Sequence, residues 1–313
     1  MDCSVLVATY NRAHLLAETL EALGKQDVPP KVAWEIVVVD NNSRDGTRSV
    51  VEEFASRAPC DVQYRFEARQ GLAHARNTGV REARGSILAF TDDDVIPDVQ
   101  WLARIVAAMT AIDLDGVGGK VLPLWETECP TWLKERPDLL HWLALMIHED
   151  PAQLTYPIRP SCGIVGANMA FRRRVFEGLG SFDTTLGHKG RKLYGGEEIE
   201  FVHRLLKAGR SIAYDPTVQV HHRIGKDRLR KSFFLKRLFD SAEGTALQVR
   251  PPTGVPLILG AERWRYRQLM SRLSRTAWLT VRRDPGAIRQ QLGIAPPSAA
   301  RTAFADVHAP SLI

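Results

Sequence analysis

Continuous apolar runs alternate with stretches of helical spacing through the first third of the chain. The runs cover residues 3–8, 35–39 and 87–90, and a strand that is buried on both faces reads as such a run. Between the first two, residues 13–23 place Leu16, Leu20 and Leu23 on one helical face. The alternation predicts an α/β fold with a doubly wound, mostly parallel sheet and helices on both faces.

The same pattern continues toward the C-terminus. We expect further strands over residues 61–66 and 116–122, and helices over 47–58, 71–83 and 101–112. Residues 124–158, rich in Trp, Pro and Leu, are interpreted as a helical insertion whose tryptophans form core or a platform for sugar stacking. The later elements expected are a strand within 163–173, a helix from 174, a helix from 197, a strand and turn over 211–216 and a short strand over 217–222.

Polar side chains gather where the predicted strands end. Thr9 follows the first strand and Asp40 the second, while Asp92, Asp93 and Asp94 follow the strand over residues 87–90. Ligands of parallel sheets bind beyond the carboxyl ends of the strands. Adjacent carboxylates repel one another unless a cation lies opposite, and Mg²⁺ usually binds through one or two carboxylates plus substrate phosphates. The alternative is a solvated acidic loop that caps the following helix.

Other residues are candidates with a structural alternative beside each. Arg76 is a candidate for a phosphate or base contact, or is a surface or helix-capping arginine. Glu197 and Glu198 begin a helix, where the helix dipole favours acids, and either is also able to act as a general base. His221 and His222 follow a short strand, so one of them can complete an Asp/His metal site.

Composition narrows the function classes. The chain has 313 residues, of which 44% are hydrophobic and 25% charged, as expected for a globular protein. It contains neither GxGxxG after the first strand nor GxxxxGK[ST], which disfavours dinucleotide-binding and P-loop folds. No apolar tract is long enough to span a bilayer, and the four cysteines lack metal-site spacing, so we expect a cytoplasmic protein.

The net charge of +6 is unevenly distributed. Residues 223–291 hold 16 Lys and Arg against 5 Asp and Glu, a surplus of +11 that leaves −5 for the rest of the chain. Within them, residues 257–281 read as a basic amphipathic helix, which suits the anionic inner face of the plasma membrane. The alternative is a helix packed on the catalytic domain with solvated arginines.

A series of motifs appears in a family-specific order. They are VATYNR, VVVDNNSRDGT, GLAHARNTGVREARG, FTDDDVIPDVQWL, GANMAFRR, GGEEIEF, and YDPTVQVHHR followed by FFLKRLF. Each motif is weak alone, but the ordered series is specific. Residues 3–239 therefore resemble the family-2, inverting glycosyltransferases of bacterial type, which have the GT-A fold.

The resemblance implies a role for each matching residue. The positions implied to bind the nucleotide sugar are Thr9, Asn11, Arg12, Asp40, Arg76, Asp92 and Asp93. Asp94, with Asp92 and His222, is implied to bind Mg²⁺ or Mn²⁺ at the diphosphate. Glu198 matches the general base, with Glu197 as the alternate because the chain carries Glu where the family usually has Asp. The loop over residues 188–192 is expected to order over the bound nucleotide.

The implied reaction is a metal-dependent, inverting transfer from a nucleotide sugar, a UDP-sugar, to a hydroxyl of a saccharide or lipid-linked acceptor, in cell-surface polysaccharide or glycoconjugate synthesis. We expect a GT-A catalytic domain over residues 1–222, with 1–122 as its nucleotide-binding half and 123–222 as its acceptor-binding half. A basic helical extension over 223–294 and a flexible tail over 295–313 would follow.

Two alternatives remain. A nucleotidyltransferase acting on sugar phosphates should show a glycine-rich, basic loop after the first strand, which this chain lacks. An Arg-rich nucleic-acid-binding protein would show strongly salt-dependent binding but leaves the acids at the strand ends unexplained. We therefore expect no nucleic-acid partner.

Overall fold

The computed structural model describes residues 1–147, 164–188, 195–248, 257–258 and 261–262, with side chains as far as Ser241. The chain divides into two compact units. The larger comprises Met1–Cys129 and Leu139–Ser241, and the smaller comprises Pro130–Asp138 and Ala242–Ile313. The expected division at residue 222, and that between 122 and 123, stay predictions.

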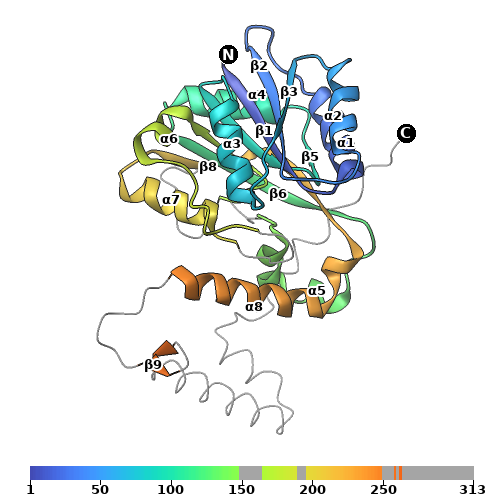
Figure 1. Ribbon diagram of the computed structural model, residues 1–313, viewed down its shortest axis with the longest axis vertical. Helices are drawn as coiled ribbons and strands as arrows, with labels where there is room; N and C mark the ends of the chain where they lie inside the picture. Colours follow the sequence, from blue (N-terminus) through green and yellow to red (C-terminus); the bar gives the residue numbers. More distant parts are fainter. Residues whose placement is uncertain (148–163, 189–194, 249–256, 259–260, 263–313) are drawn as a thin grey trace. The chain divides into compact units, whose positions relative to one another are not determined.

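The larger unit is built on a mixed sheet, in which the described strands follow the order β3-β2-β1-β4-β7-β6-β8-β5 (Figure 1). The strands are β1 (Cys3–Thr9), β2 (Trp34–Asp40), β3 (Asp61–Phe66), β4 (Ile87–Asp92), β5 (Val95–Pro97), β6 (Gly116–Trp125), β7 (Met169–Arg172) and β8 (Ile212–Ile224). Neighbours among β1 to β4 are parallel, as are β6 and β8, whereas β7 is antiparallel to β4 and β6. The mostly parallel α/β sheet predicted from the sequence is confirmed.

Helices cover both faces of this sheet. They are α1 (Ala13–Gly24), α2 (Thr47–Ala55), α3 (Leu72–Glu82), α4 (Trp101–Ala111), α6 (Arg173–Leu179) and α7 (Glu197–Lys207), with α8 (Lys231–Gln248) after β8. The main core joins Leu6 and Val37 of the strands to residues of α3, α6 and α7, and the rings of Phe176 and Phe201 stack 4.6 Å apart. The helices α1 and α2 pack together, while α4 packs on β6 and β8.

Short elements mark the insertion after β6. The helix α5 (Thr131–Lys134) and the 3₁₀ helix η1 (Pro137–Leu143) fall within the expected helical insertion. A second 3₁₀ helix, η2 (Lys226–Leu229), connects β8 to α8. The remaining part of the insertion, residues 148–158, lies outside the described residues.

The strand β5 was not predicted, because three residues are too few to show a period. It follows the acidic turn directly and runs antiparallel to β8, with Val95 opposite His222. The backbone NH of Arg223 donates to the carbonyl oxygen of Asp94 at 2.9 Å. This pairing brings the end of β8 beside the acids, although more than 120 residues separate them in the chain.

The turn predicted over residues 211–216 is wrong, because β8 continues through it as one strand of 13 residues. The register against β6 shifts between Gly119 and Lys120. Asp215 stabilises the irregularity locally, since its Oδ1 accepts hydrogen bonds from the NH and the hydroxyl of Thr217 at 2.8 and 2.7 Å. A Pro and an Asp therefore produce a bulge here where the sequence pattern suggested a break.

The helix predicted from residue 257 is wrong where the structure describes it. Strand β9 (Leu257–Ile258) pairs antiparallel with β10 (Ala261–Glu262). A short apolar run fits strand and helix equally well, so spacing alone did not separate them. Residues 263–281 of the expected helix and the expected tail 295–313 lie outside the described residues. Among the helices that the structure does describe, none combines the length and apolar character needed to cross a bilayer.

Candidate active site

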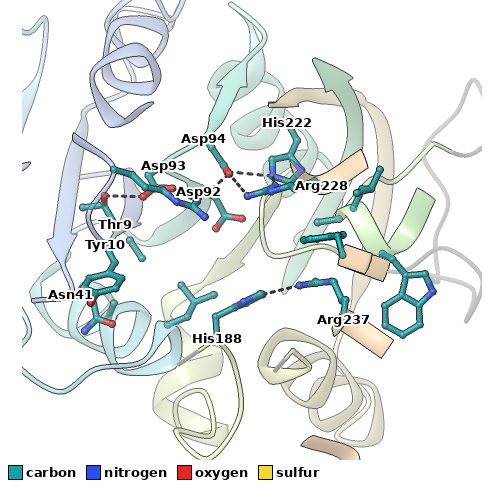
Figure 2. A pocket seen from close by; sticks show the side chains of 18 of the residues that line it. Thr9, Tyr10, Asn41, Asp92, Asp93, Asp94, His188, His222, Arg228 and Arg237 are labelled. Carbon is teal, nitrogen blue, oxygen red and sulfur yellow. Dashed lines mark hydrogen bonds and ion pairs between the residues drawn. The ribbon is translucent and has the colours of Figure 1, made fainter. Parts of the chain in front are cut away.

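A pocket of about 360 Å³ opens at the carboxyl ends of the strands (Figure 2). Its polar lining comes from three parts of the chain. The β1–α1 junction supplies Thr9, Tyr10 and Arg12, the β4–β5 turn supplies Asp92, Asp93 and Asp94, and the C-terminal half supplies His188, His222, Arg228 and Arg237. Asn41, Trp142 and Phe233 also line the pocket.

Asp93 anchors the acidic turn to the first strand. The Thr9 hydroxyl donates to Asp93 Oδ2 at 2.8 Å, and Arg12 Nη1 donates to Asp93 Oδ1 at 2.9 Å. Burial and the neighbouring charge of Asp94 raise the pKa of Asp93 to about 6, although Arg12 opposes the rise. Thr9 and Arg12 thus position the turn as well as lining the pocket.

Asp94 lies at the centre of a charged network. Its Oδ1 is 3.3 Å from His222 Nε2, and its Oδ2 accepts from Arg228 Nη2 at 2.7 Å and from Arg12 Nη1 at 3.1 Å. Burial alone would raise the pKa of Asp94, but His222 and the two arginines hold it well below its usual range. Asp94 is therefore an ionised carboxylate at neutral pH.

Arg76 lies beneath Asp92 in a buried ion-pair network. Its Nη1 donates to Glu197 Oε1 at 2.6 Å, and its Nη2 donates to Asp92 Oδ1 at 3.2 Å. The guanidinium packs so closely on Gly166 that a Cβ built there would be 2.4 Å from Nη2. Arg76 is not among the residues that line the pocket, so its contact with a nucleotide stays a prediction.

Glu197 and Glu198 occupy different environments in the first turn of α7. Glu197 is 2% exposed. Burial and the charge of Glu198 raise the pKa of Glu197 to about 8, even though Arg76 opposes the rise. Glu198 is only partly buried. Among the described residues, the Oε2 of each glutamate has no hydrogen-bond partner. The role of Glu198 as base stays a prediction, since Glu198 does not line the pocket.

Asn11 and Asp40 fix the loop between β2 and α2 and do not line the pocket. Asn11 has a φ of 53°, and its Oδ1 accepts from the NH of Arg44 at 2.8 Å. Asp40 accepts from the NH of Ser43 and from the Tyr64 hydroxyl, each at 2.8 Å. Their predicted contacts with the nucleotide stay predictions.

Two arginines of this pocket were not predicted as site residues. Arg228 follows β8, and Arg237 belongs to α8, beyond the boundary expected at residue 222. Arg237 is part of the FFLKRLF motif. The motif could have pointed to Arg237, because it follows the other motifs in the family order. No rule of charge or spacing, however, linked Arg237 to the ends of the strands.

Of the three residues implied to bind a metal, Asp94 and His222 are in contact. Among the described residues, no group of three or more His, Cys, Asp and Glu side chains is arranged to hold a metal ion. Asp94 and His222 are adjacent, and the buried Nδ1 of His222 has no partner. Two carboxylates and an imidazole suit Mg²⁺ or Mn²⁺ when phosphate oxygens complete the coordination, so the donor set fits.

Comparison with known protein families shows to which family this chain belongs. Residues 4–180, more than half of the chain, match the family model described as "Glycosyl transferase family 2". The chain belongs to glycosyl transferase family 2. This confirms the resemblance and identifies the protein as a glycosyltransferase that uses nucleotide-sugar donors.

Three sequence relatives show how far the likeness extends. Glycosyltransferase AglE of Haloferax volcanii is 40% identical over 119 residues, which are 38% of each chain. The succinoglycan biosynthesis protein ExoM of Rhizobium meliloti is 28% identical over 238 residues, covering 76% of this chain and 72% of that protein. A glucosyl-dolichyl phosphate glucuronosyltransferase of Haloferax volcanii is 27% identical over 249 residues, covering 76% and 74%. The chain thus matches less than two fifths of AglE but most of the other two.

A solved structure supports the fold. The mannosyltransferase PcManGT of Pyrobaculum calidifontis, in complex with GDP-Man and Mn²⁺, superimposes with a TM-score of 0.55 and 26% identity. The match covers 80% of this chain and 65% of that one. The GT-A fold expected from the motifs is confirmed.

Proposed function

We propose that this glycosyltransferase catalyses a metal-dependent, inverting transfer from a UDP-sugar to a hydroxyl of a saccharide or lipid-linked acceptor. The observation that carries the proposal is the network around Asp94. A buried carboxylate is surrounded by His222, Arg228 and Arg12 at the edge of the sheet where ligands of parallel strands bind.

The arginines suit a diphosphate. Arg12 and Arg228 both pair with Asp94, and a planar guanidinium can bind phosphate through two parallel hydrogen bonds. Asp94 would hold the cation when a donor is bound. Both guanidinium groups would then be available to the phosphate oxygens.

Asp94 and Asp92, with His222 beside them, would hold Mg²⁺ or Mn²⁺. When bound, the cation offsets the charge that develops on the departing nucleoside diphosphate. The chain's own contribution is to fix the acidic turn, through Thr9 and Arg12, and to hold Asp92 in place through Arg76. The Mn²⁺ of the Pyrobaculum calidifontis mannosyltransferase is consistent with this choice of ion.

Glu198 is proposed as the general base, with Glu197 as the alternate. A base must be ionised before it removes a proton from the attacking hydroxyl. Glu197 has a raised pKa and is held by Arg76, whereas Glu198 is more exposed and forms no such ion pair among the described residues. Direct attack by the deprotonated hydroxyl inverts the anomeric carbon.

The acceptor is proposed to belong to a cell-surface polysaccharide or glycoconjugate, and to be presented at the inner face of the plasma membrane. The names of ExoM and of the glucuronosyltransferase, which refer to succinoglycan and to a dolichyl phosphate, support this class. Helix α8 also exposes Leu235, Leu238 and Phe239 by 68%, 42% and 71%. An anionic bilayer suits this apolar face because the surrounding chain carries a surplus of positive charge.

Release of nucleoside diphosphate tests the proposal. UDP-, GDP- and TDP-linked sugars are incubated with the protein and a saccharide panel, with Mn²⁺, with Mg²⁺ and with excess chelator. We expect release from UDP-sugars with either ion and none after chelation, and NMR should show the product anomer inverted. Release that persists in chelator, or a retained anomer, would contradict the proposal. The alternatives of a nucleotidyltransferase and of a nucleic-acid-binding protein lose their support to the family assignment.

A further inference from the structure

Arg237 is a partly buried arginine of the pocket, and among the described residues it has no salt-bridge partner. Its Nη1 lies 3.2 Å from His188 Nε2, and its Nε is buried without a hydrogen-bond partner. Burial lowers the pKa of His188 to about 3, so this histidine is neutral and accepts a hydrogen bond from Arg237. Among the described residues, no carboxylate forms a salt bridge with Arg237.

The other two arginines that line the pocket are already paired. Arg12 is bonded to Asp93 and Asp94, and Arg228 is bonded to Asp94. Arginine stays charged in proteins, and a charge that is partly removed from water is costly when no counter-ion pairs with it. The position of Arg237 is therefore explained if a ligand supplies the missing negative charge.

Arg237 lies on the opposite side of the pocket from the proposed metal residues. Figure 2 shows Asp94, His222 and Arg228 in one group and the His188–Arg237 pair in another. The carboxylates that act on the charge of Arg237 include those of Glu198 and Glu197. Arg237 is therefore within electrostatic range of Glu198, the proposed base.

An apolar wall accompanies this arginine. Phe233 precedes Arg237 by four residues on α8, so both lie on one face of the helix, and both line the pocket. Trp142 and Leu143 line the same pocket. A cation beside aromatic and aliphatic side chains suits a ligand that combines an anionic group with an apolar part.

We propose that Arg237 binds an anionic group of the acceptor, a phosphate or a carboxylate, and thereby selects charged acceptors. The inference rests on the proposed function, because it assigns the acceptor to the side of Glu198. His188 orients the guanidinium of Arg237, and the remaining NH groups of the guanidinium bind the oxygens of the anion. Phe233 and Trp142 contact the apolar part of the same acceptor.

The test measures acceptor binding to the full-length protein saturated with UDP and Mn²⁺. The probes are dodecyl glucoside, which is neutral, dodecyl phosphate-linked glucose and dodecyl glucuronide. We expect the wild-type protein to bind at least one charged probe about 10- to 100-fold more tightly than the neutral one, as fits one or two charge-assisted hydrogen bonds. Preference for the phosphate or for the carboxylate identifies the anion.

Substitutions then assign the preference to Arg237. Arg237→Gln should remove it and leave binding of the neutral probe unchanged, and Arg237→Lys should restore part of it. The matched control is Arg230→Gln, because Arg230 is 64% exposed on its side chain, pairs with Asp227 and does not line the pocket. Thermal unfolding should show that Arg237→Gln is no less stable than the wild type, since it removes a partly buried charge that forms no salt bridge with the described residues.

Two results would overturn the inference. One is equal affinity for charged and neutral probes in the wild type, including failure to bind either. The other is a charge preference that Arg237→Gln retains. UDP binding is measured separately by calorimetry in the same samples: loss of UDP binding by the wild type defeats the proposed function, whereas a UDP defect confined to Arg237→Gln places the arginine on the donor and defeats the inference.

Discussion

The adjacent glutamates at the start of α7 show how burial gives two chemically identical side chains different environments. Glu197 contacts Arg76 and is closed off from solvent, while Glu198 is partly exposed. The sequence showed two acids in a first helical turn but not which one was buried. Only the path of the chain between α3 and α7 makes Arg76 the partner of the first.

Replacing Glu198 by Gln tests the assignment of the base. Loss of a general base lowers turnover by about 10²- to 10⁴-fold, and the amide should leave the affinity for UDP with Mn²⁺ within about twofold of the wild type, as no donor contact is removed. Glu200→Gln is the control, since Glu200 lies in the same turn and pairs with Arg204. Single-turnover transfer and calorimetry measure the two effects, and near-normal transfer by Glu198→Gln would place the base elsewhere.

The raised pKa of Glu197 predicts a pH-dependent stability. In the unfolded chain this group titrates near its ordinary value, and in the folded protein near pH 8. Its proton therefore favours the folded state fully below the unfolded pKa, and this contribution is lost as pH rises toward 8, by up to about 1.4 kcal/mol per pH unit.

Urea unfolding between pH 5 and 8.5 measures this contribution. The wild-type free energy of unfolding should fall with pH more steeply than that of Glu197→Gln, which carries no titrating group at this position. Parallel profiles for the two proteins would show that Glu197 does not retain a proton in the folded state.

At the scale of elements, the site depends on an irregular pairing of strands. The carboxyl ends of β1, β2 and β4 were predictable from apolar runs followed by polar residues. The residue pattern offered His221 or His222 as a partner of the acids, and only the family resemblance selected His222. The approach of His222 to Asp94 arises because β5 pairs with β8, and a three-residue strand and a bulged strand leave no periodic signal.

Asn168 stabilises this irregular region. Its Oδ1 accepts from Trp101 Nε1 at 2.8 Å, and its amide donates to the carbonyl oxygens of Lys120 and Val218 at 2.8 and 2.9 Å. Asn168 is fully buried. It therefore connects α4, β6 and β8 at the point where the register changes.

Asn168→Ala should lower the free energy of unfolding by about 3 kcal/mol, because it leaves one donor and two acceptors buried without partners. Asn168→Asp, which keeps the acceptor for Trp101 but loses the amide donor, should also destabilise and so tests the two carbonyl contacts. Denaturant unfolding of both variants beside the wild type measures the losses. A loss below 1 kcal/mol for Asn168→Ala would show that the bulge does not depend on this side chain.

At the scale of the whole molecule, the sequence indicated the catalytic fold correctly, but the candidate site residues that it offered ended at His222. Arg228 and Arg237 line the pocket although they follow residue 222. Charge counting assigned both to a basic extension, since a surplus of arginine carries no information about which of its members line a pocket. That depends on how η2 and α8 pack and not on composition.

The exposed face of α8 predicts binding to anionic vesicles. Sedimentation with phosphatidylglycerol vesicles should show binding that weakens with salt, because charged contacts are screened, and phosphatidylcholine vesicles should bind much less. The double substitution Leu238→Ser with Phe239→Ser should reduce binding by about tenfold or more, as buried apolar area is lost.

Leu206→Ser is the control for this experiment, because Leu206 is an exposed leucine of α7 with 39% exposure. It should leave vesicle binding unchanged. Equal losses in the control and in the double variant, or equal binding to neutral and anionic vesicles, would contradict a role for α8.

Calorimetric titration of UDP with Mn²⁺ into the wild type and into Asp94→Asn tests the central claim most directly, namely that the network around Asp94 is the donor site. We predict that the wild type binds UDP only with the divalent ion, and that Asp94→Asn weakens this binding by at least about tenfold. Undiminished binding by Asp94→Asn, or binding by the wild type that is the same in chelator, would contradict the account.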